Sequence, residues 1–260
     1  MSGNEITFTE EGNGIPVVLL HGYPFDKSMW SEQLEAIAAA GFRAIAPDLR
    51  GLGETKSSSE VATMDEMARD VAALLDELNV DNAVICGLSM GGYVAFDFMH
   101  LFPARVVGLV LAGTRAPADN EQEKAGREQQ VQTMLRAGMV PISIATLPKL
   151  LGQRTLAEKP EVVKRVRAMI TRSAPNGAAA AQRGMAARRD YTEDLSQINA
   201  PTLIIVGRED SIRPIADAEF MHRGIRNSRL EIIEDAAHMT NMEQPEIFNK
   251  ALLAFLKQGT

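Results

Sequence analysis

The 260-residue chain is predicted to adopt an α/β fold built on a parallel sheet, for three reasons. Short apolar runs alternate along the sequence with segments whose apolar residues recur at helical spacing. Each short run is apolar throughout, as expected for a strand that is covered on both faces. Strands that alternate with helices in this way favour parallel pairing through right-handed crossovers.

Six runs account for the predicted strands. They span residues 17–20, 43–49, 83–86, 106–112, 202–206 and 229–233. Open α/β sheets place their functional sites at the carboxyl ends of the strands. The loops that follow these runs are therefore the expected location of the chemistry.

Three helix boundaries carry recognisable signals. Thr63 and Glu66, three residues apart, form the pattern of a capping box before an amphipathic segment. Gly41 follows a run of alanines and is the residue expected just past a helix C-terminus. Pro245 fits the first turn of a last helix that is predicted to reach about residue 256.

The segment from 115 to 194 breaks the alternation of strand and helix. It is rich in Ala, Met, Arg and Gln, and shows no clear strand. We interpret it as a helical cap over the strand ends, which divides the chain into a core of residues 1–114 and 195–260 and a cap of residues 115–194. The cap methionines at 134, 139, 169 and 185 are expected to form its core rather than an acyl pocket. The basic groups at 164–167 and 188–189 are expected to be solvated helix faces.

Composition narrows the classes of function. Apolar residues make up 45% and charged residues 23%, as in ordinary globular proteins, and the apolar runs are too short to cross a bilayer. The first ten residues lack a signal-peptide pattern. A net charge of −7 argues against nucleic-acid binding, and the single cysteine, Cys86, excludes a disulfide framework and suits a reducing cytosol. We expect a cytoplasmic enzyme or small-ligand binder with neither nucleic-acid nor membrane partners, and a buried, inert Cys86.

The segment Gly87-Leu88-Ser89-Met90-Gly91 lies where the third predicted strand meets a helix, which is the setting of a G-x-S-x-G nucleophile elbow. A sharp turn there projects the serine hydroxyl above the sheet, while small neighbours let strand and helix approach. The Met90 amide is then free at a helix N-terminus, where it can stabilise an oxyanion. The alternative is a glycine-rich turn whose serine only caps the helix.

A serine nucleophile needs a base, and the base needs an orienting acid. Asp210 follows the fifth predicted strand and His238 lies in the loop after the last one, so both are expected near Ser89. Asp210 could instead cap a helix, in which case neighbouring Glu209 is the replacement acid. His238 could be a surface histidine.

The other histidines have different predicted places. His100 and His222 fall on helices and are expected to be solvated, whereas His21 is expected to fix its own loop. That loop, His21-Gly22-Tyr23-Pro24, should place the Tyr23 amide opposite the Met90 amide, so that two donors converge on one oxygen. The alternative is a plain Gly-Pro turn.

With these residues in this order, the chain resembles the α/β-hydrolase superfamily, in particular its small cap-bearing branch. That branch contains carboxylesterases, cofactor-free perhydrolase-type esterases and 3-oxoadipate enol-lactonase-like enzymes. The resemblance implies a mostly parallel central sheet flanked by helices, with a helical cap inserted after the sixth core strand. The matching motifs are His-Gly-x-Pro at 21–24, Pro-Asp-Leu-Arg-Gly-Leu-Gly at 47–53, Gly-x-Ser-x-Gly-Gly at 87–92, Gly-x-x-Asp at 207–210, and His238 followed by Asn-Met-Glu-Gln-Pro at 241–245.

The resemblance also implies the roles of single residues. Ser89, Asp210 and His238 would form the catalytic triad, and the backbone amides of Tyr23 and Met90 would form the oxyanion hole. Asp48 and Arg50 resemble a pair that braces a loop. A serine at position 89 separates this chain from the dehalogenase and epoxide hydrolase branches, whose nucleophile is an aspartate.

The implied function is a serine hydrolase that cleaves small carboxylic esters or lactones through an acyl-enzyme on Ser89, with no cofactor and no metal. Two alternatives stay open. One is C–C bond hydrolysis or perhydrolysis on the same triad. The other is a ligand-binding homologue that keeps the triad without turning substrate over.

Overall fold

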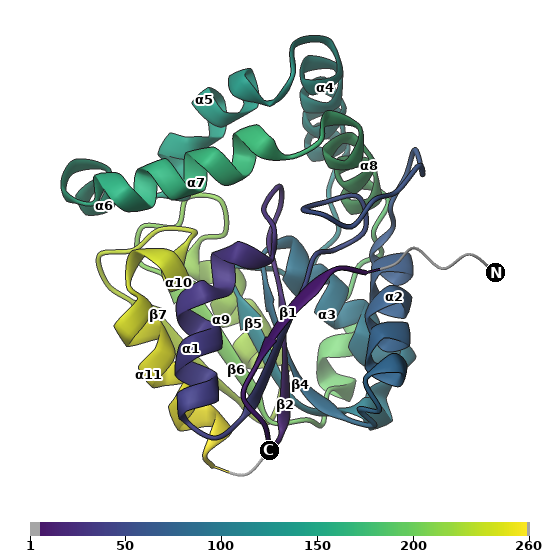
Figure 1. Cartoon of the computed structure of the whole chain (residues 1–260), viewed down its shortest axis with the longest axis vertical. Helices are drawn as coiled ribbons and strands as arrows, with labels where there is room; N and C mark the ends of the chain where they lie inside the picture. The colour runs from purple at the N-terminus through teal and green to yellow at the C-terminus, as the bar shows by residue number, and fades with distance from the viewer. Residues whose placement is uncertain (1–5, 259–260) are drawn as a thin grey trace.

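The structure is a computed structural model that describes residues 6–258, so residues 1–5 of the N-terminal stretch and residues 259–260 lie outside it. Within the described residues the centre is a seven-stranded sheet in the order β1-β3-β2-β4-β5-β6-β7 (Figure 1). Strand β1 pairs antiparallel with β3, and the other pairs are parallel. The strands are β1 (Phe8–Glu11), β2 (Pro16–Leu20), β3 (Arg43–Pro47), β4 (Ala83–Leu88), β5 (Val106–Ala112), β6 (Thr202–Gly207) and β7 (Ser228–Ile233).

The six strands predicted from apolar runs are all present as β2 to β7, with ends that differ by up to two residues. Strand β1 was not predicted. Its residues are half-buried or exposed and end in two glutamates, because an edge strand is covered on one side only. An apolar run cannot reveal a strand of that kind.

Helices cover both faces of the sheet. Helix α1 packs on α11, and α2 packs on α3, and Figure 1 shows these two pairs on either side of the strands. The predicted capping box is confirmed, because the Thr63 hydroxyl accepts from the Glu66 amide and the Glu66 carboxylate accepts from the Thr63 amide. The core helices are α1 (Ser31–Ala39), α2 (Met64–Glu77), α3 (Met90–Leu101), α9 (Ile215–Gly224), α10 (Thr240–Glu243) and α11 (Pro245–Leu256).

Five helices lie between β5 and β6 and sit above the sheet at the top of Figure 1. This cap follows the fifth strand, not the sixth that the resemblance implied, because a single described strand, β1, precedes β2. The four cap methionines are buried, as predicted for a cap core, but Met185 also lines a cavity that contains Ser89. The cap helices are α4 (Glu121–Ala137), α5 (Met139–Leu150), α6 (Gln153–Glu158), α7 (Pro160–Arg172) and α8 (Pro175–Ala186).

The prediction that Arg188 lies on a solvated face is wrong. Its side chain is fully buried and pairs with the buried Asp119 at 2.7 Å between Nη1 and Oδ1. Asp119 also pairs with Arg115 and Arg127, so one carboxylate helps to neutralise three guanidinium groups. Helical periodicity cannot reveal a partner that is distant in sequence, which is why Arg188 was misassigned.

Asp48 and Arg50 each brace a loop, but they do not pair with each other. Asp48 is buried and accepts from the Lys27 amide at 2.7 Å and the Lys27 ammonium at 2.6 Å. Arg50 instead makes a bidentate pair with Asp70 on α2. The two residues therefore stabilise different contacts, Asp48 with the segment at Lys27 and Arg50 with α2.

Two buried groups, Cys86 on β4 and Asp97 on α3, have shifted pKa values. Burial raises the pKa of the Cys86 thiol, which fits the predicted inert cysteine. Burial also raises the pKa of the Asp97 carboxyl on α3 to about 6, from its ordinary value of 3.8. The ionised form of Asp97 is therefore less favourable in the folded protein than in the unfolded chain.

Asp97→Asn should gain stability relative to the wild type as the pH rises from about 4 to about 8. A raised folded-state pKa means that the stabilising contribution is present at low pH and is lost as the pH rises through about 6. Urea unfolding at both pH values measures the change in the difference between variant and wild type. Asp81→Asn, at an exposed carboxyl, is the control. If the free energy of unfolding of Asp97→Asn, relative to that of the wild type, does not increase with pH, the assignment is contradicted.

Candidate active site

Ser89 occupies a strained turn between β4 and α3. Its backbone has φ 55° and ψ −112°, in a region that L-residues rarely adopt. The turn is held because the Ser89 amide donates to the Ala112 carbonyl at 2.8 Å and its carbonyl accepts from the Gly92 amide at 2.9 Å. The half-buried side chain consequently lies at the carboxyl edge of the sheet, beside the N-terminus of α3, as the elbow motif predicts.

The two glycines of the motif allow the strand and helix to meet. A Cβ at Gly87 would lie 2.2 Å from the Gly91 carbonyl oxygen. A Cβ at Gly91 would lie 2.1 Å from the Leu20 carbonyl oxygen on β2. Both separations are too short for a carbon and an oxygen, so the elbow requires glycine at both positions.

Asp210 and His238 meet although they come from different loops. Asp210 follows β6 and His238 follows β7, and Asp210 Oδ2 lies 2.8 Å from His238 Nδ1. Both side chains are buried. An ionised carboxylate can only accept, so this contact assigns the proton to Nδ1 and leaves Nε2 as a proton acceptor.

Asp210 and Glu209, the two candidates for the orienting acid, make different contacts. Asp210 Oδ1 accepts from the amides of Ile212 and Arg213 at 2.9 and 2.8 Å, so the residue also caps the turn that follows it. Glu209 points elsewhere, because its Oε2 accepts from the Gln153 amide of α6 at 2.9 Å. The structure therefore brings Asp210, and not Glu209, to His238.

The loop that carries His238 is tied to the cap. The amides of His238 and Met239 both donate to the Leu150 carbonyl at the end of α5, at 3.1 Å. The buried Glu243 carboxylate accepts from the Ala237 amide at 2.8 Å and from the Gly152 amide at 2.6 Å. Burial raises the pKa of Glu243. Sequence reasoning assigned no role to Glu243, although it lies within the motif at 241–245.

His21 has the structural role predicted for it. Its ring is buried, Nδ1 donates to the Gly22 carbonyl at 2.9 Å, and Nε2 accepts from the Leu49 amide at 2.9 Å. Burial lowers the pKa of His21, which favours this neutral form with both nitrogens engaged. The ring therefore joins the loop after β2 to the loop after β3.

The Tyr23–Pro24 peptide bond, which is cis, lies in the same loop, after His21 and Gly22. Tyr23 and Pro24 line the same cavity as Ser89 and His238. The assignment of the Tyr23 and Met90 amides to an oxyanion hole stays a prediction. The other two histidines lie on exposed helical positions, as expected, His100 on α3 and His222 on α9.

The cavity beside Ser89 and His238 has a volume of about 140 Å³. Its walls come from the core loops and from cap helices α4, α5 and α8. Its lining residues include two arginines, Arg127 and Arg213, and Tyr93. The cavity is therefore small and polar on one wall.

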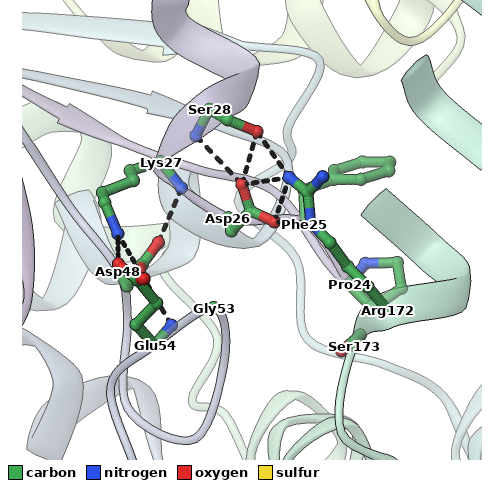
Figure 2. Close-up of a pocket in the computed structure, with 10 residues that line it drawn as sticks. All are labelled: Pro24, Phe25, Asp26, Lys27, Ser28, Asp48, Gly53, Glu54, Arg172 and Ser173. Carbon is green, nitrogen blue, oxygen red and sulfur yellow. Dashed lines mark hydrogen bonds and ion pairs between the residues drawn. The ribbon is translucent and has the colours of Figure 1, made fainter. Parts of the chain in front are cut away.

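A larger cavity, of about 340 Å³, lies beyond Pro24 and is shown in Figure 2. Its charged side chains bind one another: Arg172 of α7 pairs with Asp26 at 2.6 Å, and Lys27 pairs with Asp48. It contains neither the elbow serine nor a histidine. The smaller cavity, and not this one, is therefore the cavity that Ser89 and His238 share.

Across residues 6–258, no three His, Cys, Asp or Glu side chains are grouped so that they could hold a metal ion. In the same part of the chain, every helix is too short or too polar to cross a membrane.

Comparisons with known proteins agree with this architecture. The sequence pattern of the α/β hydrolase fold family matches residues 15–245. A thermophilic esterase from Thermogutta terrifontis has a solved structure with a TM-score of 0.95 and 41% identity, over 97% of this chain and 93% of that one. 3-Oxoadipate enol-lactonase 2 of Acinetobacter baylyi is 31% identical over 89% of this chain and 84% of its own length. A non-heme haloperoxidase of Rhodococcus erythropolis is 29% identical over 98% of this chain and 97% of its own length.

Gly91→Ala should lower the free energy of unfolding by about 2 kcal/mol or more, because the added methyl group overpacks the contact between α3 and β2. Gly126→Ala is the matched control, since a Cβ there meets no atom within 4 Å and it lies within α4. The control should be neutral or slightly stabilising. Chemical denaturation compares both variants with the wild type, and a Gly91→Ala protein of unchanged stability would rule out the close approach.

Proposed function

The chain belongs to the α/β hydrolase fold family, and on this basis we propose that it is a serine hydrolase that cleaves small carboxylic esters or lactones. The observation that carries the proposal is the 2.8 Å contact between Asp210 and His238 beside the cavity that Ser89 lines. A nucleophile, a base with a free ring nitrogen, and an orienting acid are the groups that acyl transfer requires.

Acylation begins when the Ser89 Oγ attacks the carbonyl carbon of the substrate. His238 Nε2 takes the hydroxyl proton as the new C–O bond forms, and the Asp210 carboxylate stabilises the resulting imidazolium. The amides of Tyr23 and Met90 would donate to the oxyanion of the tetrahedral intermediate. The bond to the leaving oxygen then breaks, and His238 returns the proton to that oxygen.

Deacylation repeats these steps with water as the nucleophile. His238 Nε2 removes a proton from water, the hydroxide adds to the acyl carbon, and Ser89 leaves with the proton returned. An open-chain ester releases its alcohol in the first half of the reaction. A lactone keeps its hydroxyl group attached to the acyl chain and is released as one hydroxy acid.

The names of the similar proteins support two outcomes for the acyl-enzyme. Esterase and enol-lactonase describe cleavage of open and cyclic esters, which favours water as the second nucleophile. The haloperoxidase relative favours the alternative of perhydrolysis, in which hydrogen peroxide attacks the acyl-enzyme and a peracid leaves. Formation of peracid from an ester and hydrogen peroxide distinguishes the two.

Ser89→Ala should lower kcat by about a million-fold, because the attacking oxygen is removed. The measurement is hydrolysis of p-nitrophenyl esters of increasing chain length and of aliphatic lactones. Ser58→Ala, at an exposed serine, is the control and should keep wild-type rates. Unchanged turnover by a clean Ser89→Ala preparation ends the proposal.

Asp210→Asn should lower kcat by about 10⁴-fold, since the amide no longer holds His238 in the tautomer that exposes Nε2. Glu209→Gln should change kcat by less than about tenfold, because Glu209 bonds to α6 instead. The same ester assay is run on both variants. A larger loss for Glu209→Gln than for Asp210→Asn would make Glu209 the orienting acid.

A further inference from the structure

The cavity that contains Ser89 has a positively charged wall, although the chain as a whole carries a net charge of −7. Arg213 lies three residues after Asp210, and Arg127 comes from α4 of the cap. Their side chains are partly or largely buried, where a charge loses much of its hydration. The cleavage of a neutral ester does not require such charges.

Arg213 and Tyr93 form the centre of this wall. Arg213 Nη2 and Nε donate to the Tyr93 hydroxyl at 2.6 and 3.1 Å, and Nη1 donates to the Ile212 carbonyl at 2.6 Å. A guanidinium group has five N–H donors, so donors remain for a ligand. The Tyr93 oxygen accepts from Arg213, which leaves its own O–H to donate.

This pair lies one helical turn from the elbow. Tyr93 is on α3, and its amide donates to the Ser89 carbonyl at 3.3 Å. Ser89 and Tyr93 line the same cavity, so a molecule bound there can contact both residues. A cavity of about 140 Å³ is small for a ligand site and also favours a short molecule.

The wall is incompletely neutralised by carboxylates. Arg115, Arg127 and Arg188 share Asp119, and Arg115 also pairs with Glu123. Arg213, in contrast, makes no ion pair with any of residues 6–258. Its charge acts on the Asp217 carboxyl, and its backbone amide, not its guanidinium group, donates to Asp210. An anion in the cavity would supply the missing partner.

The pKa of the Tyr93 hydroxyl also reflects the positive charge of this wall. Burial by itself would raise the pKa of the Tyr93 hydroxyl, but the guanidinium groups of Arg213, Arg188 and Arg127 bring the pKa below its ordinary value. The Arg188 guanidinium lies 4.1 Å from the centre of the Tyr93 ring. A potential that favours a phenolate also favours a carboxylate placed beside it.

We propose that Arg213, Tyr93 and Arg127 form a carboxylate subsite, and that the substrate is a short ester or lactone which carries a free carboxylate of its own. The inference rests on the proposed function for the bond that is cleaved. The carboxylate accepts from Arg213 and from the Tyr93 O–H, while Arg127 adds charge from the cap. This arrangement holds the ester carbonyl against Ser89.

Matched pairs of substrates test the subsite. Monomethyl glutarate and methyl pentanoate differ in a carboxylate on the acyl side, and 4-acetoxybutanoate and butyl acetate differ in one on the alcohol side. In at least one pair, kcat/KM should be about tenfold or more higher for the charged member, as expected for charge-assisted hydrogen bonds. The pair that responds identifies the side that bears the carboxylate. Equal or lower rates for both charged members overturn the proposal.

Variants identify the residues responsible. Arg213→Gln and Tyr93→Phe should each reduce the charged-to-neutral ratio of kcat/KM by about tenfold. Arg223→Gln, at an exposed arginine of α9, is the control and should leave that ratio unchanged. A ratio that is unaffected by both pocket variants, or affected equally by Arg223→Gln, contradicts the assignment.

A binding measurement separates this inference from the proposed function. Ser89→Ala protein is titrated calorimetrically with glutarate and with pentanamide, a neutral molecule of similar length. Glutarate should bind at least about tenfold more tightly, and Arg213→Gln introduced into the same background should remove the difference. If binding follows this pattern while no ester is turned over, the proposed function fails and the subsite stands. If esters are cleaved and glutarate does not bind, the subsite fails alone.

Discussion

The structure around the site depends on one hydrogen bond, the 2.8 Å contact between Asp210 and His238. It joins the loops after β6 and β7 and determines which ring nitrogen of His238 is free. The parallel sheet makes the contact possible, because its strands release their following loops at one edge. In the proposed mechanism, loss of this bond would leave the Ser89 hydroxyl without an oriented base.

The cap covers this edge of the sheet and also contributes hydrogen bonds and side chains to the site. The Leu150 carbonyl receives the amides of His238 and Met239, and Glu243 links the histidine loop to Gly152. Arg127 of α4 reaches into the same cavity. Cap and core thus build the site together. Changes in the cap sequence are therefore expected to alter both the position of His238 and the charge of the cavity.

Sequence patterns predicted those features that depend on short segments and on the order of motifs along the chain. Apolar runs located β2 to β7, and the elbow motif with the order Ser89, Asp210, His238 located side chains that the structure gathers at one edge. The edge strand β1 was missed because it is only half covered. Arg188 was misplaced, and Glu243, Tyr93 and Arg213 were passed over, because their surroundings come from segments far apart in the sequence.

The central claim, that Ser89 is the nucleophile of this site, is tested most directly by labelling with a fluorophosphonate. The reagent should inactivate ester hydrolysis, with one adduct per chain, and peptide mass spectrometry should locate that adduct on Ser89. The rate of labelling should fall in Asp210→Asn, because the hydroxyl then lacks an oriented base. Full ester turnover by protein that is completely labelled at Ser89, or inactivation through an adduct at another residue, would contradict the account.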